Sequence, residues 1–225
     1  MRTDELIVQL ARAAGPVQPL SRPSVRLARW TAAAVPMSAL GVIVFGPRGD
    51  VMTAIHQPVF VGLALASLLT ALLSAASAFV LSVPGAERSP LQRVMPLVAG
   101  SLWALVLVVL LIAGGDPVRR VLDFPLHLAC VIEIAAVGVV PGWALFAMLR
   151  RAAPLRRAWS AALATLAAVA LGAVATQFIC PLDDPAHQLV GHVLPVAFLA
   201  VFGAIAGRRS LNWLVSRPRR PHPAS

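Results

Sequence analysis

The chain has 225 residues, of which 59% are hydrophobic and only 12% are charged, with a mean hydropathy of +0.82. A soluble domain carries about 25% charged residues, so this composition excludes an ordinary soluble domain and indicates a membrane protein. All nineteen basic residues are arginines, and the formal net charge is +10. These arginines lie between apolar stretches rather than in one basic patch, which favours a membrane topology signal over nucleic-acid binding.

The first 26 residues are predicted to form a separate polar segment, and they lack the apolar core of a signal peptide. Thr3 is expected to cap a short helix whose first turn carries Asp4 and Glu5. Gly15 and Pro16 are expected to end that helix.

The apolar side chains of this short helix recur on one face, at Leu6, Ile7 and Leu10. A helix of this length is marginally stable by itself. We therefore expect its apolar face to pack on the membrane surface, on the chain's own loops or on a partner protein.

Six apolar stretches follow, and each is close to the roughly 20 residues that a membrane-spanning helix needs. They cover residues 27–45, 60–82, 94–114, 126–149, 158–180 and 188–207. The predicted fold class is all-α, an integral membrane bundle of six transmembrane helices. We expect three parts, namely a cytoplasmic N-terminal segment (1–26), the transmembrane domain (27–207) and a basic cytoplasmic tail (208–225).

The arginines are distributed unevenly between the two sides of this predicted bundle. Sixteen lie in the terminal segments and in the second and fourth connections, whereas the alternate connections hold three, Arg48, Arg119 and Arg120. Because cytoplasmic loops are enriched in basic residues, both termini are predicted to be cytoplasmic. Trp30, Trp159 and Trp213 then lie near cytoplasmic boundaries, as aromatic belt residues do.

With this topology, the two cysteines fall on the same, outer side of the membrane. Cys130 lies near the outer end of the fourth stretch, and Cys180 ends the fifth, where Pro181 prevents the helix from continuing. In a bacterial inner membrane, the outer side faces the oxidising periplasm. The sequence leaves open whether the two thiols approach each other, form a disulfide or bind a metal.

Other polar groups accompany each cysteine. His127 is adjacent to Cys130 on one helix face, and Glu133 lies one turn deeper. Glu133 is the only charged residue well inside an apolar stretch, which makes it a candidate functional group. The last outer connection and the start of the sixth stretch add four polar residues: Asp183, Asp184, His187 and His192.

Thiolate and imidazole groups suit zinc and copper ions, but the sequence contains neither CxxC nor HExxH. His187 and His192 are about 140° apart around an α-helix, so we do not expect them to chelate as a pair within one helix. Structural roles are the alternatives: Asp183 and Asp184 as helix caps, the histidines as interface residues, Cys130 as an inert apolar residue and Glu133 as a partner of another helix.

Several short stretches recur in an order that resembles a known family. They are Arg2-Thr3-Asp4-Glu5-Leu6-Ile7 with Leu10-Ala11, Pro16-Val17-Gln18-Pro19-Leu20, Leu81-Ser82-Val83-Pro84-Gly85 after the second span, Cys130-Val131-Ile132-Glu133, and Cys180-Pro181 with His187, His192 and Pro195. Together with the six spans, they resemble the NrsF family of bacterial inner-membrane anti-sigma factors. The resemblance implies that the N-terminal segment, including Asp4, Glu5, Leu6, Ile7 and Leu10, helps to hold a sigma factor. It also implies that Cys130 and Cys180 belong to the stress-sensing side.

The resulting hypothesis is a non-enzymatic, multi-pass protein of the bacterial inner membrane. It would sequester an extracytoplasmic-function (ECF) sigma factor on the cytoplasmic side and release it when periplasm-facing cysteines sense metal or oxidative stress. The expected partners are this sigma factor and the lipid bilayer, with no direct contact to nucleic acid. No resident cofactor is expected, and a transient heavy-metal ligand at Cys130 and Cys180 is left open. Two alternatives are a membrane redox or metal- or haem-binding protein that uses the His/Cys cluster, and a purely structural membrane protein.

Overall fold

The computed structural model describes residues 2–13, 19–83, 85–86, 89–114, 124–152 and 154–210, and all regular elements in these ranges are helices. They are α1 (Thr3–Ala13), α2 (Pro23–Phe45), α3 (Val51–Ala54), α4 (Pro58–Leu81), α5 (Pro90–Gly114), α6 (Phe124–Arg150), α7 (Arg157–Gln177), α8 (Pro185–Gln188), a π-helix η2 (Leu189–Val193) and α9 (Leu194–Ser210). Six helical segments are long and apolar enough to cross a membrane, the last of them running through α8, η2 and α9. The predictions of an all-α fold and six spans are confirmed for these ranges.

Prolines mark where several spans begin. Pro23, Pro58 and Pro185 occupy the first helical turn of α2, α4 and α8, where the missing amide proton costs nothing because it has no partner in the helix. At the other end of α2, Gly46 adopts a φ of 91° and its amide donates to the Val42 carbonyl, a conformation that favours glycine. The fifth span ends at Gln177, three residues earlier than predicted, which places Cys180 in the connection that follows.

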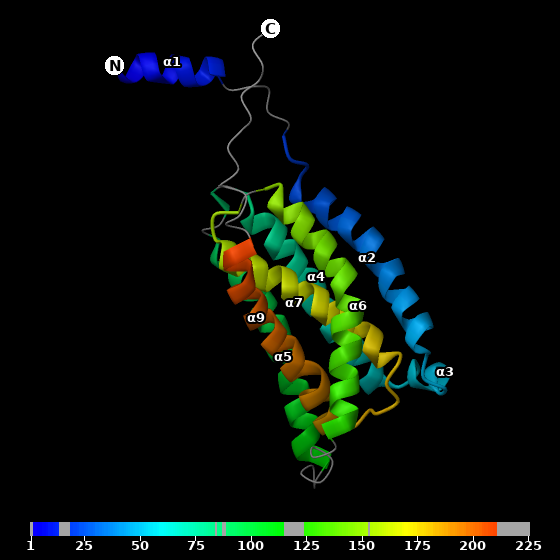
Figure 1. Cartoon of the computed structure of the whole chain (residues 1–225). Helices are drawn as coiled ribbons and strands as arrows, with labels where there is room; N and C mark the ends of the chain where they lie inside the picture. Colours follow the sequence, from blue (N-terminus) through cyan, green and yellow to red (C-terminus); the bar gives the residue numbers. More distant parts are fainter. Residues whose placement is uncertain are drawn as a thin grey trace.

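The bundle is organised around α7, which packs against α4, α6 and α9 (Figure 1). In its most apolar stretch, 67% of α7 is buried, compared with 17% of α2. Small side chains allow this contact. A Cβ at Gly172 of α7 would collide with the Ile134 carbonyl oxygen of α6, and a Cβ at Gly138 would lie 3.0 Å from the Ala168 carbonyl oxygen. The backbones of α6 and α7 therefore approach closely.

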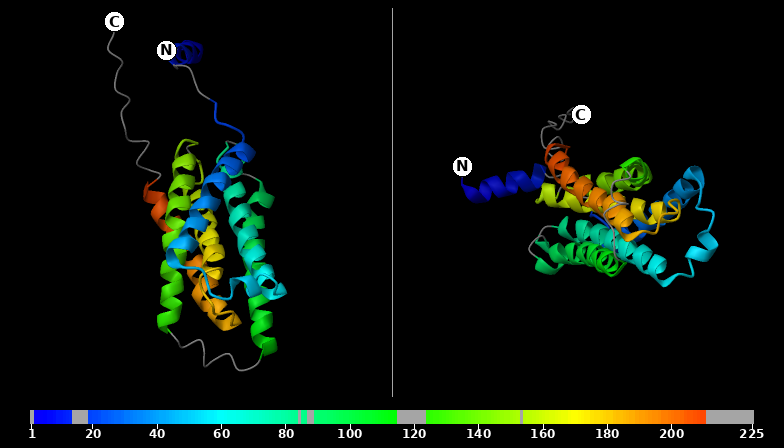
Figure 2. Two further views of the ribbon diagram at one scale, coloured as in Figure 1. Left: turned by 90° about the vertical axis from the view of Figure 1, so that its right-hand side faces the viewer. Right: turned by 90° about the horizontal axis from the view of Figure 1, so that it is seen from below.

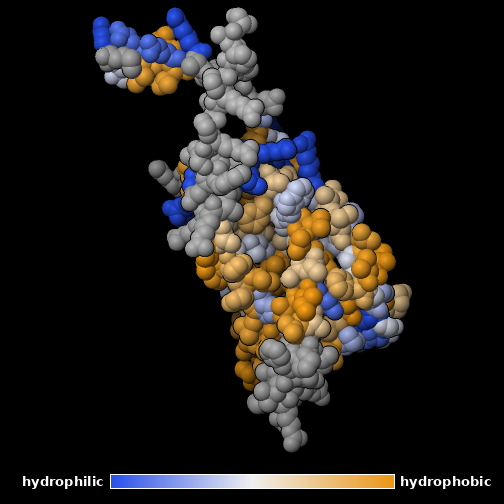
Figure 3. Space-filling model, viewed as in Figure 1, coloured by the Kyte–Doolittle hydropathy of each residue, from blue (hydrophilic) through white to orange (hydrophobic). Residues whose placement is uncertain are grey.

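Large apolar side chains cover the outside of the bundle, and strongly hydrophilic residues gather toward its two ends (Figure 3). In water such a surface would be an association or aggregation surface. A bilayer is the solvent that accepts it, in agreement with the six membrane-spanning helices.

The two ends of the bundle carry different elements. α2 begins and α9 ends at one end, and α1 lies beyond that same end (Figures 1 and 2). The connection that contains α3, the connection after α7, and α8 lie toward the opposite end. The side chains described in α1 are exposed.

Two sequence-based assignments are wrong. Trp30 is not a belt residue, because it is 1% exposed and its Nε1 donates to the Pro141 carbonyl at 2.9 Å. Thr3 is the first residue of α1 rather than its cap, since the Leu6 amide bonds to the Arg2 carbonyl. Glu5 accepts a hydrogen bond from the Arg2 amide at 3.1 Å.

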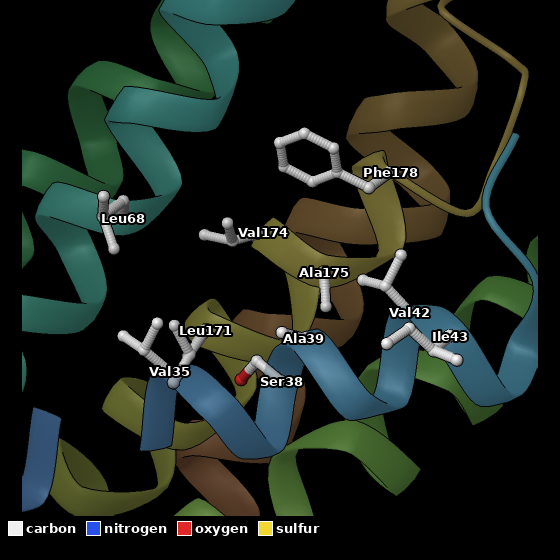
Figure 4. Close-up of a pocket in the computed structure, with 10 residues that line it drawn as sticks. All are labelled: Val35, Ser38, Ala39, Val42, Ile43, Leu68, Leu171, Val174, Ala175 and Phe178. Carbon is white, nitrogen blue, oxygen red and sulfur yellow. The ribbon is translucent and has the colours of Figure 1, made fainter. Parts of the chain in front are cut away.

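A groove of about 450 Å³ separates the middle of α2 from α4 and α7 (Figure 4). Val35 and Ser38 of α2 line one wall, and Leu68, Val174 and Phe178 line the others. Only 17% of the most apolar stretch of α2 is buried, and polar contacts near its two ends add to its attachment.

Candidate functional site

Four buried side chains meet where the start of α6 faces the connection after α7 and the beginning of the last span. The Sγ atoms of Cys130 and Cys180 are 3.6 Å apart. The Nε2 atom of His187 lies 3.4 Å from the first sulfur and 3.3 Å from the second. With His192, each residue offers one donor atom, and these four atoms all lie within 4.8 Å of one another. We refer to Cys130, Cys180, His187 and His192 as the thiol–imidazole cluster.

The end of α7 fixes the position of Cys180. The Cys180 amide donates to the Thr176 carbonyl at 2.7 Å, which keeps the chain coiled for one more turn. Pro181 then stops the coil, because it has no amide proton to continue it. Cys130 projects from α6, which packs closely on α7 at Gly172. The contact between the two thiols therefore depends on how these helices pack.

The two histidines are oriented by an N-cap and by the π-helix. The Asp184 side chain accepts hydrogen bonds from the Ala186 and His187 amides, which starts α8 with His187 facing inward. In the π-helix, the Leu194 amide bonds to the Leu189 carbonyl, five residues earlier. This wide turn changes the angular spacing along the helix.

The sequence-based expectation for the angle between His187 and His192 is therefore wrong. It assumed the angular spacing of an α-helix, whereas η2 has the wider turn of a π-helix. The two rings have centroids 5.6 Å apart, and their donor atoms belong to one cluster.

Arg48, in the loop after α2, holds the connection that carries Cys180. Its guanidinium donates to both carboxylate oxygens of Asp183, at 2.7 and 2.6 Å, and to the Cys180 carbonyl at 3.1 Å. It also donates to both oxygens of Asp50, at 2.6 and 2.9 Å. Its own amide donates to the Phe178 carbonyl at 2.9 Å. The Asp183 and Asp50 hydrogen bonds raise the pKa of Arg48 above its usual range, and the Arg48 hydrogen bond lowers the pKa of Asp50.

A second buried arginine, Arg26, lies near the start of α2. It donates to the Ser82 hydroxyl and to the Met148 carbonyl, both at 3.0 Å, and its guanidinium lies 4.6 Å from the centre of the Phe79 ring. α2 is thus attached by an arginine near each end. From the sequence, both arginines serve only as topology signals, Arg26 on the side of the termini and Arg48 on the opposite side.

The remaining predicted residues are distributed around the cluster. Asp183 pairs with Arg48, and Asp184 caps α8. Glu133 lies one turn deeper on α6, outside the set of four close donors, and its Oε2 atom is buried with no hydrogen-bond partner among the described residues. His127 lies in α6, but its side chain is outside the part of the chain that the structure describes. Asp4, Glu5, Leu6, Ile7 and Leu10 lie together on α1, away from the cluster.

This arrangement supports two kinds of chemistry. Both thiols are free, so an oxidant could join them, and two sulfurs with two imidazole nitrogens form a set of soft metal donors.

Comparison with known proteins identifies one family. The family model described as NrsF, negative regulator of sigma F, matches residues 10–213, which is nearly the whole chain. No curated protein and no solved structure matches the chain significantly.

Proposed function

Because the chain belongs to the NrsF family of negative regulators of sigma F, we propose that it is a membrane anti-sigma factor that holds an ECF-type sigma factor and keeps it from RNA polymerase. The membrane is the bacterial inner membrane. Sixteen of the nineteen arginines belong to the side of the termini, which supports a cytoplasmic location for α1 and the tail.

The output surface is the apolar face of α1. Ile7 is 58% exposed and Leu10 is 62% exposed, although both are large apolar side chains. An amphipathic helix with an uncovered apolar face is a common element of helix-in-groove recognition. A sigma factor on the cytoplasmic side would cover this face.

The input is the pair of thiols on the periplasmic side, and the observation that carries this assignment is the 3.6 Å distance between the Cys130 and Cys180 sulfurs. A thiol-reactive metal or oxidant that links the two sulfurs would bring α6 and the connection after α7 into a new arrangement. To release the sigma factor a hundredfold, the signal must favour the low-affinity state by about 2.7 kcal/mol. One new covalent or metal link is sufficient for this free energy.

The signal reaches the output through α2. Arg48 attaches the outer end of α2 to the Cys180 connection, and Arg26 attaches its inner end to α4 and α6. Its 23 residues span about 35 Å, and the polypeptide continues from its start back to α1. The apolar groove beside the middle of α2 (Figure 4) leaves room for the helix to shift when the Cys180 connection moves.

The test is a pair of measurements in cells that carry a reporter for the sigma factor. The intact protein should capture the sigma factor from detergent extracts and keep the reporter off, and deletion of residues 1–14 should abolish both effects. The double variant Cys130→Ser/Cys180→Ser should still capture the sigma factor but fail to release it under metal or oxidative stress. Normal induction in that variant would refute the sensing role of the two cysteines. Undiminished capture without residues 1–14 would refute the role of α1 in binding the sigma factor.

A further inference from the structure

We propose that the thiol–imidazole cluster is a binding site for a thiophilic divalent cation such as Zn²⁺ or Cd²⁺, with Cys130, Cys180, His187 and His192 as its four ligands. This inference rests on the proposed function, because it specifies the signal that the periplasmic side receives. It adds the two histidines as ligands and a stoichiometry of one ion per chain.

The distances match a tetrahedral site. With Zn–S bonds near 2.3 Å and Zn–N bonds near 2.0–2.1 Å, tetrahedral geometry places two sulfur ligands about 3.8 Å apart and a sulfur and a nitrogen about 3.6 Å apart. The observed separations are 3.6 Å between the sulfurs, and 3.4 and 3.3 Å from the sulfurs to the His187 nitrogen. The fourth donor, on His192, lies within 4.8 Å of the other three. A small adjustment of one imidazole would complete the tetrahedron.

The surroundings also suit a metal. All four ligands are buried, so the ion would be enclosed as in a four-coordinate structural site. The positions of the ligands are set by groups that do not bind the ion: Asp184 caps the helix that carries His187, and Arg48 holds the Cys180 carbonyl. Outer contacts of this kind fix ligand orientation and contribute to metal affinity.

Charge and softness select the class of ion. Binding one divalent cation converts both thiols to thiolates and releases two protons, so the charges of the ion and its ligands cancel at the edge of the membrane. Two sulfur and two imidazole donors favour zinc-like ions over Mg²⁺ and Ca²⁺, which take oxygen ligands. The two thiolates are also the groups that a disulfide would consume, so metal binding and disulfide formation exclude each other at this site.

The experiment uses the full-length protein in detergent micelles, reduced and freed of metal with a chelator, without the sigma factor. Titration with Cd²⁺ against a competing chelator should give one ion per chain, a near-ultraviolet thiolate-to-metal absorption band and two protons released per ion. His187→Ala and His192→Ala should each lower the affinity by about 100-fold or more. His56→Ala is the matched control, because His56 is an exposed histidine just after α3, and α3 lies toward the same end of the bundle. This variant should bind as the wild type does.

A ligand substitution separates coordination from packing. His187→Cys replaces one soft ligand with another, so it should keep a single ion and strengthen the thiolate absorption band. Loss of binding as complete as in His187→Ala would overturn the proposal, and so would wild-type affinity in both alanine variants. Capture of the sigma factor by the same metal-free preparations is measured separately, so failure of the metal site is distinguishable from failure of the anti-sigma function.

Discussion

Arg48 and Asp183 form a bidentate ion pair, with 2.6 Å between Nη2 and Oδ2, and this pair joins the loop after α2 to the connection that carries Cys180. The Arg48 side chain is almost fully buried, while that of Asp183 is 40% exposed. The guanidinium therefore has no access to water that could replace its partners. Under the proposed function, Arg48 is the residue through which a movement of the Cys180 connection reaches α2.

Arg48→Ala should weaken the link between the loop after α2 and the Cys180 connection, while the backbone hydrogen bond from residue 48 to the Phe178 carbonyl remains. It removes two charge-assisted hydrogen bonds to Asp183 and one to the Cys180 carbonyl. Because Asp183 regains water, the loss of stability should be about 2 kcal/mol. Under the proposed function, the sigma-dependent reporter should rise in unstressed cells, which a transcription assay measures.

Asp50→Asn is the control for Arg48→Ala. Asp50 also binds Arg48, but its side chain is 52% exposed, and the ion pair and side-chain hydrogen bonds that it forms are with Arg48 in its own loop. The reporter should stay off in this variant. An equal rise in both variants would show that the Arg48–Asp50 pair within the loop, rather than the link from Arg48 to the Cys180 connection, controls the reporter.

Mild oxidation should join Cys130 and Cys180 within one chain. The sulfurs are already in contact. A cross-link across 50 residues would lower the entropy of the unfolded chain and so stabilise the folded protein by up to about 4 kcal/mol. The oxidised protein should therefore melt at a higher temperature and resist labelling by a maleimide after denaturation. Cys130→Ser should show no such shift, and a wild-type protein whose two thiols both remain labelled after oxidation would contradict the geometry.

The membrane spans can be predicted from the sequence, but the meeting of the four side chains in the thiol–imidazole cluster cannot. Apolar length identifies a membrane helix because the bilayer sets one requirement for all six, and prolines place several of the starts. Trp30 shows the limit of such rules. Its position near a span boundary is typical of a belt residue, but helix rotation turns it inward, where its indole reaches the Pro141 carbonyl.

The cluster depends on two features that no periodicity reveals. The π-helix changes the angle between His187 and His192, and the α6–α7 contact at Gly172 brings together cysteines that are fifty residues apart. From the sequence, Arg48 is only one of three arginines in the outer connections. Its partner Asp183 is 135 residues away, and such a pairing is specified only by the packed bundle.

Gly172→Leu should separate α6 from α7. Even a Cβ at this position collides with the Ile134 carbonyl oxygen, and backbone atoms cannot move away as a flexible side chain can. Overpacking of this kind typically costs about 1–3 kcal/mol. Thermal unfolding in detergent should show the loss, and the oxidative cross-link between Cys130 and Cys180 should form more slowly because the two helices carry the thiols.

Gly62→Leu is the matched control, since a Cβ at Gly62 of α4 meets nothing within 4 Å. It should change neither the unfolding temperature nor the rate of cross-linking. If the two leucine variants behave alike, the close approach of α6 and α7 does not hold the cysteines together.

Charge placed on the apolar face of α1 should abolish capture of the sigma factor. Ile7 and Leu10 lie on the face of α1 that also carries Leu6, and this face is uncovered in the structure (Figure 3). An arginine buried at either position against a partner would have no counter-charge. The expected loss of affinity for Ile7→Arg or Leu10→Arg is therefore about 100-fold or more.

Val8→Arg is the control, because it makes the same change on the opposite side of the helix, where Val8 is 48% exposed. It should leave capture within about threefold of the wild type. The measurement is binding of the sigma factor by the full-length protein in detergent micelles. Equal losses of affinity in Leu10→Arg and Val8→Arg would mean that the apolar face of α1 is not what the sigma factor recognises. Unchanged affinity in Ile7→Arg and Leu10→Arg would mean that α1 does not bind the sigma factor.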